Sequence, residues 1–244
     1  MINHWDKDKY TISNELINYC KSNVTLIMAT LNEEKTIKYI LDSSRPFCKE
    51  ILVIDGHSSD QTRDIAQENG AIVFLDHGLG KGDAIRVGIM KASEKVLVFI
   101  DADMSHNPED IPKLVAPIFH NNVDHVVGSR PKGGSDELHG DFNKFIRMIG
   151  SDIITLGINY RFNVRLTDSQ NGFRAIKSSV AQKLNLQENI TTIEQELTIK
   201  TLKHHYKIAE VPTHEYARLY GDSRISLIKV STRYVYSWLK YLFF

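Results

Sequence analysis

The 244-residue sequence predicts a single α/β domain, built on a mixed, mostly parallel sheet that is flanked by helices. Two observations predict this class. Short apolar runs rich in β-branched residues alternate with segments whose apolar residues recur at helical spacing. The apolar runs are also nearly continuous, which is typical of parallel strands covered by helices on both faces. No internal repeat, low-complexity tract or Pro/Gly-rich linker divides the sequence.

The expected elements follow one another along the chain. The strands, in order, are VTLIMAT (24–30), ILVID (51–55), AIVFL (71–75), VLVFID (96–101) and DHVVGS (124–129). The helical segments between them include EEKTIKYILDS (33–43), DQTRDIAQENG (60–70) and GDAIRVGIMKAS (82–93). The alternation weakens from about 130 to 175, where PKGGSDELHGD predicts a loop, either a lid or a plain surface loop, before an apolar helix at 142–158.

Composition excludes several classes of protein. The 30 Lys and Arg residues balance 30 Asp and Glu residues, so the chain lacks the basic excess of a nucleic-acid-binding protein. No apolar run approaches the roughly 20 residues that span a bilayer, and MINHWDKDKY contains no secretory h-region. Two cysteines, Cys20 and Cys48, are too few for a disulfide scaffold. We therefore expect a cytoplasmic protein.

The C-terminal segment is basic and aromatic, and it ends in RYVYSWLKYLFF (233–244). Trp238 and its neighbouring tyrosines suit a lipid headgroup boundary, where Arg233 and Lys240 would meet phosphates. A packed amphipathic helix explains the same pattern, and both interpretations stay open. We expect an N-terminal extension (1–22), the α/β domain (23–215) and this C-terminal segment (216–244).

Two aspartates close the fourth expected strand, in VLVFIDADMSHNPED (96–110). Asp101 and Asp103 project to the same side of an extended segment, where their carboxylates repel each other. A hard divalent cation, Mg²⁺ or Mn²⁺, would relieve that repulsion with water and substrate phosphates as its other ligands. The pair therefore predicts a site for a metal-bound diphosphate. The simpler interpretation is a solvated strand end with an aspartate that caps the helix near Pro108.

Two other classes of site use the same spacing of aspartates. An EF-hand loop requires Gly at its sixth position, where this chain has His106, so calcium sensing is excluded. Haloacid-dehalogenase phosphatases use the first aspartate as a nucleophile, but their motif follows the first strand of the core. Here three βα units precede it, which disfavours the phosphatase.

Further polar clusters follow the other expected strands, and the carboxyl ends of parallel strands form the ligand crevice of such folds. In DGHSSD, capping explains Asp60 but not Asp55, which could accept hydrogen bonds from a ribose or base. In TLNEE, Asn32 and Glu33 either cap a helix or line the crevice. GLGKGDAIRVG permits close backbone approach, but it is not a P-loop because Gly82 follows Lys81.

Two later motifs carry charge. In TDSQNGFRA, Asp168 precedes an Asn-Gly turn, where an isolated aspartate is commonly structural. In YARLYGDSR, Arg218 and Arg224 flank a glycine and could clamp phosphates, although solvated basic residues are the simpler interpretation.

In this order the motifs resemble the inverting family-2 glycosyltransferases with a GT-A fold. The likeness is greatest to polyprenol-phosphate sugar transferases of the dolichol-phosphate mannosyltransferase type, and it runs from Val24 to about Ile228. It implies metal-dependent transfer of a sugar from a nucleotide-diphospho-sugar, GDP-mannose or a UDP-sugar, to a polyprenyl or dolichyl phosphate. It also implies a peripheral position at the cytosolic face of a membrane.

The resemblance also assigns roles. On the donor side it implies contacts to base, ribose and diphosphate from Asn32, Glu33, Asp55, Lys81, Gly82, Asp101, Arg218 and Arg224. The metal would be held by Asp101 and Asp103. Arg130 in VGSR would face the substrate, while Asp168 and Glu196, the latter in EQELTIK, would lie on the acceptor side. Ser105 stands where this type of enzyme commonly has Gln as a further metal ligand, so that coordination is left to Ser or water.

Three competing functions remain. Transfer to a hydroxyl acceptor, such as a glycan or a small phosphorylated acid, would need Asp168 as a base, whereas an ionised phosphate acceptor would not. A sugar nucleotidyltransferase would carry a Gly/Arg/Lys-rich loop after its first strand, where TLNEE is acidic. A non-catalytic lectin-like module would tolerate disruption of the aspartate pair, which is intact.

Overall fold

A computed structural model gives the architecture and describes residues 12–121, 123–136, 142–218 and 227–244. Seven strands in these residues form one mixed sheet, in the order β3-β2-β1-β4-β6-β5-β7. Their bounds are β1 (Val24–Thr30), β2 (Glu50–Asp55), β3 (Ile72–Leu75), β4 (Val96–Phe99), β5 (His125–Ser129), β6 (Arg174–Lys177) and β7 (Ile208–Pro212). Only β6 runs antiparallel to its neighbours among these strands. The predicted fold class, a single α/β domain on a mostly parallel sheet, is confirmed.

All five expected strands are present, but β6 and β7 were not predicted. β6 has only four residues and begins with the charged Arg174. β7 lies at the edge of the sheet, contains Glu210 and ends at Pro212, which removes a backbone donor. Both strands therefore lack the long apolar run that marks a central parallel strand.

Helices cover both faces of the sheet. Their bounds are α1 (Asn14–Asn23), α2 (Ile37–Ser44), α3 (Thr62–Glu68), α4 (Lys81–Lys91), α5 (Ile111–Asn121), α6 (Arg130–Gly133), α7 (Phe142–Phe162), α8 (Ser178–Ala181), α9 (Ile193–Lys203) and α10 (Leu227–Phe243). Alternation along β1 separates the two layers, because Leu26 and Met28 join the cluster of α1, α2 and α5, whereas Ile27 joins that of α4, α8 and α9.

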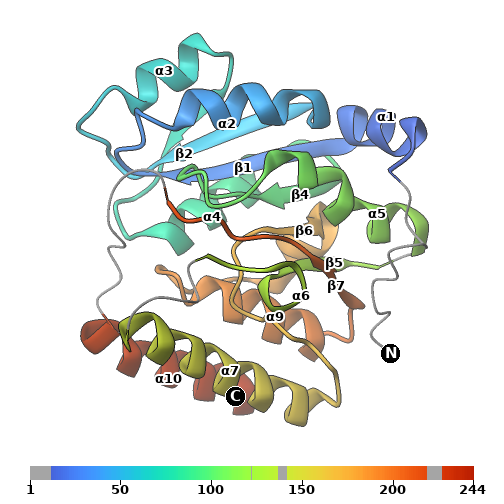
Figure 1. The fold of residues 1–244 in the computed structure, drawn as a ribbon, viewed down its shortest axis with the longest axis vertical. Helices are drawn as coiled ribbons and strands as arrows, with labels where there is room; N and C mark the ends of the chain where they lie inside the picture. Colours follow the sequence, from blue (N-terminus) through green and yellow to red (C-terminus); the bar gives the residue numbers. More distant parts are fainter. Residues whose placement is uncertain (1–11, 122, 137–141, 219–226) are drawn as a thin grey trace.

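Helices α7 and α10 add a further layer. Ile154 and Ile158 of α7 pack with Tyr241 and Leu242 of α10 against Ile199 of α9. Figure 1 shows this helix pair side by side below the sheet, away from α2 and α3. Within the described residues, no helix combines the length and apolar character needed to cross a membrane.

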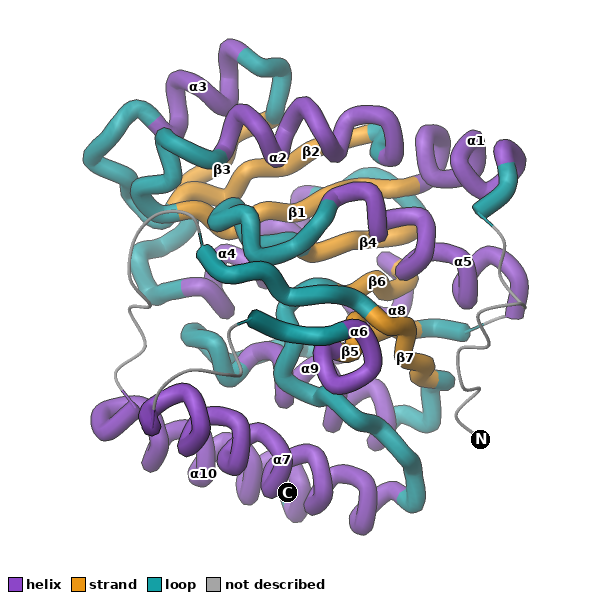
Figure 2. Tube along the Cα trace, in the orientation of Figure 1, coloured by secondary structure: helices purple, strands orange, loops and turns teal. Residues whose placement is uncertain are grey.

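The carboxyl ends of β1, β2 and β4, whose loops matter for function, lie together at one end of the sheet. Thr30 at the end of β1 pairs in register with Asp55 at the end of β2. β4 runs parallel to β1, so the Asp101 and Asp103 loop leaves the sheet at the same end. Loops and turns therefore gather there, as the tube in Figure 2 shows in teal.

Candidate active site

A cavity of about 1100 Å³ opens at the carboxyl ends of the central strands of the sheet. One wall is polar and comes from the loops after β1 and β4, including Asn32, Glu33, Asp101 and Asp103. The opposite wall comes from α7 and α10 and is largely apolar, with Ile146, Ile153, Ile154, Val235 and Trp238. One side of the cavity is thus charged and the other is apolar. Its volume is more than a typical small-molecule ligand requires.

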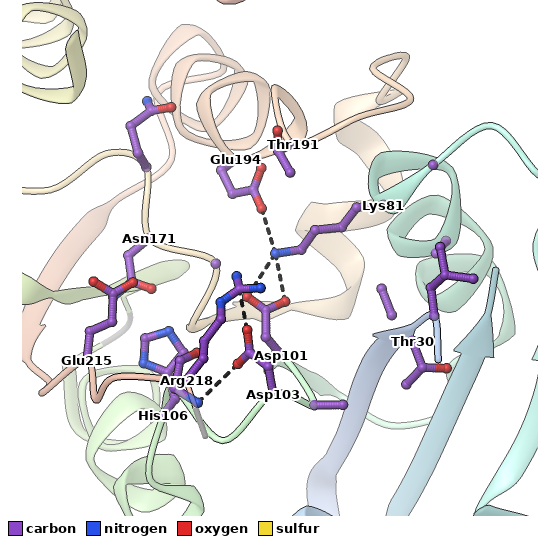
Figure 3. A pocket seen from close by; sticks show the side chains of 18 of the residues that line it. Thr30, Lys81, Asp101, Asp103, His106, Asn171, Thr191, Glu194, Glu215 and Arg218 are labelled. Atoms are coloured by element: carbon purple, nitrogen blue, oxygen red, sulfur yellow. Dashed lines mark hydrogen bonds and ion pairs between the residues drawn. The ribbon is translucent and has the colours of Figure 1, made fainter. Parts of the chain in front are cut away.

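Both aspartates of the predicted metal pair face this cavity, and both are ion-paired (Figure 3). The ammonium of Lys81 lies 2.7 Å from Oδ1 and 3.0 Å from Oδ2 of Asp101. The guanidinium of Arg218 lies 3.0 Å from Oδ2 of Asp103. Each carboxylate is therefore paired with a cationic side chain, and the two cationic side chains come from separate segments of the chain.

These contacts shift the pKa values in the site. Burial would lower the pKa of Lys81, but the carboxylates of Asp101 and Glu194 outweigh burial and raise it above its usual value. Burial would raise the pKa of Asp101, yet Lys81 holds it below the usual range. The pKa of Glu33 is raised, first by burial and then by the nearby charge of Asp103. Lys81 and Asp101 are therefore both charged at neutral pH.

Three loop residues at this end of the sheet adopt an uncommon backbone conformation. The φ angles of Asn32, His57 and Met104 are 58°, 66° and 64°. At Met104 the turn lets the backbone N–H of Ser105 donate to Oδ1 of Asp103 at 3.0 Å. At Asn32 the backbone N–H donates to Oγ of Ser58 at 2.8 Å, which ties the first loop to the second. Such conformations often mark ligand sites, where the surrounding structure maintains them.

The oxygen ligands that this site offers suit a hard divalent cation. Asp101 and Asp103 offer carboxylate oxygens, which Mg²⁺ and Mn²⁺ prefer, and both already attract cationic groups of the chain. No cluster of three or more potential side-chain ligands occurs among the described residues. A cation held here would therefore complete its coordination with water and with ligand phosphates.

A second charged group lies farther along the cavity. Arg130 lines it and donates to Asp168 through Nε at 2.6 Å and Nη2 at 3.0 Å. Its Nη1 donates to Glu215 at 3.3 Å. Burial would lower the pKa of Arg130, but Asp168 and Glu215 raise it above the usual value. Arg130 is thus a fixed cation at the cavity wall.

The structure brings Asn32, Glu33, Lys81, Asp101, Asp103, Arg130 and Arg218 together at the cavity. Two predicted residues on the donor side lie outside its lining. Asp55 is fully buried and accepts hydrogen bonds from Thr30 and Ser58, so it stabilises the loop that follows β2 without lining the cavity. Gly82 packs on the chain near Glu188, where a Cβ would collide with the Glu188 carbonyl oxygen.

The acceptor-side residues are also placed differently from expectation. Asp168 lies behind Arg130 and outside the lining. Glu196 is fully buried, and its carboxylate accepts from the backbone N–H groups of Gln187 and Glu188. The structure therefore does not bring Glu196 to the cavity. Arg224 lies outside the described residues.

The cavity residues that were not predicted include Arg147, Glu194 and Glu215. Glu194 lies two residues before Glu196 on α9, and residues at that spacing point to different sides of a helix. The sequence could not tell which of the two faces the site. Arg147 had a usable signal, because it interrupts the apolar run FIRMIGSDIITLGI.

Comparison with known proteins agrees with this geometry. The model of Glycosyl transferase family 2 matches residues 25–184. An uncharacterised protein of Methanocaldococcus jannaschii is 32% identical over 213 residues, covering 84% of this chain and 86% of that protein. A UDP-N-acetylglucosamine–dolichyl-phosphate N-acetylglucosaminyltransferase of Methanococcus voltae is 28% identical, covering 87% of this chain and 93% of that enzyme.

Solved structures extend the likeness in fold. Glucosyl-3-phosphoglycerate synthase from Mycobacterium tuberculosis, in complex with Mn²⁺, UDP and phosphoglyceric acid, superposes with a TM-score of 0.76. That match covers 100% of this chain and 86% of the synthase at 22% identity, so it supports the GT-A fold alone. With the family model spanning most of the sheet and the acidic pair, the chain belongs to glycosyl transferase family 2 and is a glycosyltransferase.

Proposed function

We propose that this glycosyltransferase moves a sugar, with inversion, from a nucleotide-diphospho-sugar to a polyprenyl phosphate. The observation that carries the proposal is the two-sided cavity, in which the acidic pair and its cations face an apolar wall made by α7 and α10. A polar donor and a lipid-linked phosphate acceptor need these two environments in one space. The name of the Methanococcus voltae relative supports a dolichyl-phosphate acceptor and a UDP-linked donor.

On the donor side, Asp101 and Asp103 would hold Mg²⁺ or Mn²⁺. The cation would supply charge neutralisation for the diphosphate that leaves the sugar. Lys81 and Arg218 already lie beside these carboxylates and would add positive charge at the same place. Asn32 and Glu33 line the adjoining part of the cavity and would lie beside the nucleoside, as would the loop that Asp55 holds.

On the acceptor side, Arg130 and Arg147 offer cationic groups to a phosphate. Arg147 comes from α7 and stands next to Ile146 at the apolar wall. A phosphate at this boundary would leave the isoprenoid chain against α7 and α10. Its oxygen would attack the anomeric carbon from the face opposite the leaving diphosphate. A phosphate monoester is largely ionised at neutral pH, so no general base is required.

The outer surface of the same helix pair supports a peripheral position on a membrane. Exposed apolar side chains recur along α7 at three- and four-residue spacing: Phe145, Ile149, Ile153, Leu156 and Tyr160. The adjacent α10 exposes Val235, Tyr236, Leu239 and Phe243. Of these, Ile153 and Val235 also line the cavity. Apolar surface of this kind, continuous with the apolar wall of the cavity, would let a lipid acceptor enter without leaving the bilayer interface.

The test is release of nucleoside diphosphate with Mg²⁺ or Mn²⁺ and a panel of UDP- and GDP-sugars, with and without a short polyprenyl phosphate. Release that requires the lipid supports the proposal. Release that requires a sugar hydroxyl or a small phosphorylated acid instead would establish the competing hydroxyl-acceptor function.

A further inference from the structure

Glu194 and Asp101 lie on opposite sides of the Lys81 ammonium (Figure 3). Glu194 lies in the first turn of α9 and is 5% exposed. Its Oε1 is 3.1 Å from the ammonium of Lys81, which also contacts both oxygens of Asp101. Figure 3 shows Lys81 reaching between the two carboxylates. One ammonium thus bridges acids from two different elements.

Lys81 is the compensating charge of Glu194. The second oxygen, Oε2, is buried and has no hydrogen-bond partner among the described residues. A buried carboxylate is costly unless a cation or donors compensate it. Glu196 on the same helix also contacts a lysine, Lys200 at 2.7 Å, but its carboxylate accepts the backbone N–H groups of Gln187 and Glu188 as well and so holds a loop. Among the described residues, Glu194 contacts Lys81 and no backbone N–H group.

We propose that Glu194 is a positioning residue that retains Lys81 at the cavity wall when a divalent cation occupies Asp101 and Asp103. The inference rests on the proposed function, which places a cation on that pair. Lys81 cannot keep both of its contacts to Asp101 in that state, because ammonium and cation compete for the same lone pairs and repel each other. Glu194 then becomes the principal partner of Lys81 and keeps it beside the leaving diphosphate.

The ion pairs of Lys81 point the same way, because its ammonium is shared between Asp101 and Glu194. A neutral residue at 194 would leave Asp101 as the remaining carboxylate partner of Lys81. Lys81 would then compete more strongly with the incoming cation.

The test is a double-mutant cycle on Mn²⁺ affinity, measured by electron paramagnetic resonance without any donor. We expect Glu194→Gln to weaken Mn²⁺ binding about tenfold. In a Lys81→Met background, the same substitution should change the affinity by no more than about threefold, because no ammonium remains to relocate. An equal loss in both backgrounds would overturn the proposal, since Glu194 would then act through space and not through Lys81.

A matched control is Glu50→Gln, which removes a hydrogen-bonded carboxylate at the start of β2, the opposite end of the sheet. It should leave Mn²⁺ affinity unchanged. Where Lys81→Met does not fold, Lys81→Gln replaces it in the cycle, because it removes the ammonium and keeps a polar side chain. A smaller effect of Glu194→Gln in that background supports the proposal, and an equal effect contradicts it.

The cycle also separates this inference from the proposed function. Wild-type protein that binds no Mn²⁺ would contradict both. Wild-type protein that binds Mn²⁺ while the two substitutions act additively would contradict the role of Glu194 alone.

Discussion

Arg130 and Asp168 form a bidentate ion pair, with Nε donating to Oδ2 at 2.6 Å and Nη2 donating to Oδ1 at 3.0 Å. Asp168 is 2% exposed and also accepts from the backbone N–H groups of Gln170 and Asn171. Burial would raise the pKa of Asp168, but Arg130 and these donors hold it below its usual range. The carboxylate is therefore a weak base whose lone pairs are occupied, and it orients Arg130 toward the cavity.

The first prediction concerns turnover of Asp168→Asn. We expect a loss of about 10- to 100-fold, with an increased KM for the acceptor, because Arg130 loses its fixed orientation. The pH profile of kcat/KM should keep its shape. A loss of several orders of magnitude together with the disappearance of the acidic limb, on which activity falls as a base is protonated, would instead identify Asp168 as a general base and favour a hydroxyl acceptor.

The second prediction concerns the acid stability of the same variant. The folded-state pKa of Asp168 is depressed, so its contribution to stability is present above the unfolded-state pKa of about 3.9 and is lost as pH falls through the folded-state value. At pH 7 the wild type should exceed Asp168→Asn by about 3 kcal/mol in free energy of unfolding, as expected for a broken buried pair. Urea unfolding across pH 2 to 7 measures this difference. A gap that stays constant down to pH 2 would contradict the assignment.

The third prediction concerns Arg218→Met. Arg218 lies 3.0 Å from the Asp103 carboxylate, and on our proposal it adds positive charge beside the leaving diphosphate when the donor is bound. Turnover should fall about 100-fold, as for the loss of one group that stabilises a transition-state charge. Mn²⁺ affinity without donor should rise, because Asp103 loses its competing cation.

Lys177→Met is the control for this variant. It removes an ion pair of 2.9 Å with Asp124 outside the cavity, and it should change neither quantity. A decrease in Mn²⁺ affinity on Arg218→Met would show that Arg218 supports the acidic pair and does not compete for it.

The fourth prediction tests the apolar face of the helix pair. Leu156 on α7 and Met90 on α4 are both 68% exposed, so they form a matched pair of sites. Leu156→Glu should weaken binding to vesicles that contain anionic lipid by about tenfold or more, since one inserted leucine contributes roughly 2 kcal/mol. Met90→Glu should leave vesicle binding unchanged. Equal effects of both substitutions in a sedimentation assay would argue against α7 as the contact surface.

The sequence predicts much of this fold because its central strands, β1, β2 and β4, are buried on both faces and read as continuous apolar runs. Their polar ends indicated Asp101 and Asp103 as crevice residues and left Asn32 open between a helix cap and the crevice; all three line the cavity. The weaker predictions fall where tertiary contacts decide. β6 depends on pairing between β4 and β5, and its Arg174 is buried because it donates to carbonyl oxygens of Asn171 and Glu194.

Some roles could not be separated by spacing alone. Asp55 ends β2 and Asp101 lies two residues beyond the end of β4, yet the carboxylate of Asp55 accepts serine and threonine hydroxyls whereas that of Asp101 contacts a lysine. Glu194 and Glu196 are equally acidic neighbours on one helix, and only the path of the chain at Gln187 and Glu188 decides which of them is held away from the cavity. The periodicity of a sequence shows which residues share a face of a helix, but it does not show which face lies against a ligand.

The most direct test of the central claim is analysis of the product made from a radiolabelled nucleotide-sugar, a polyprenyl phosphate and Mg²⁺ or Mn²⁺. We predict label in the organic phase, a phosphodiester by ³¹P NMR, and an anomeric configuration opposite to that of the donor. Label transferred only to a hydroxyl acceptor, or a product with the donor's configuration, would contradict inverting transfer to a lipid phosphate.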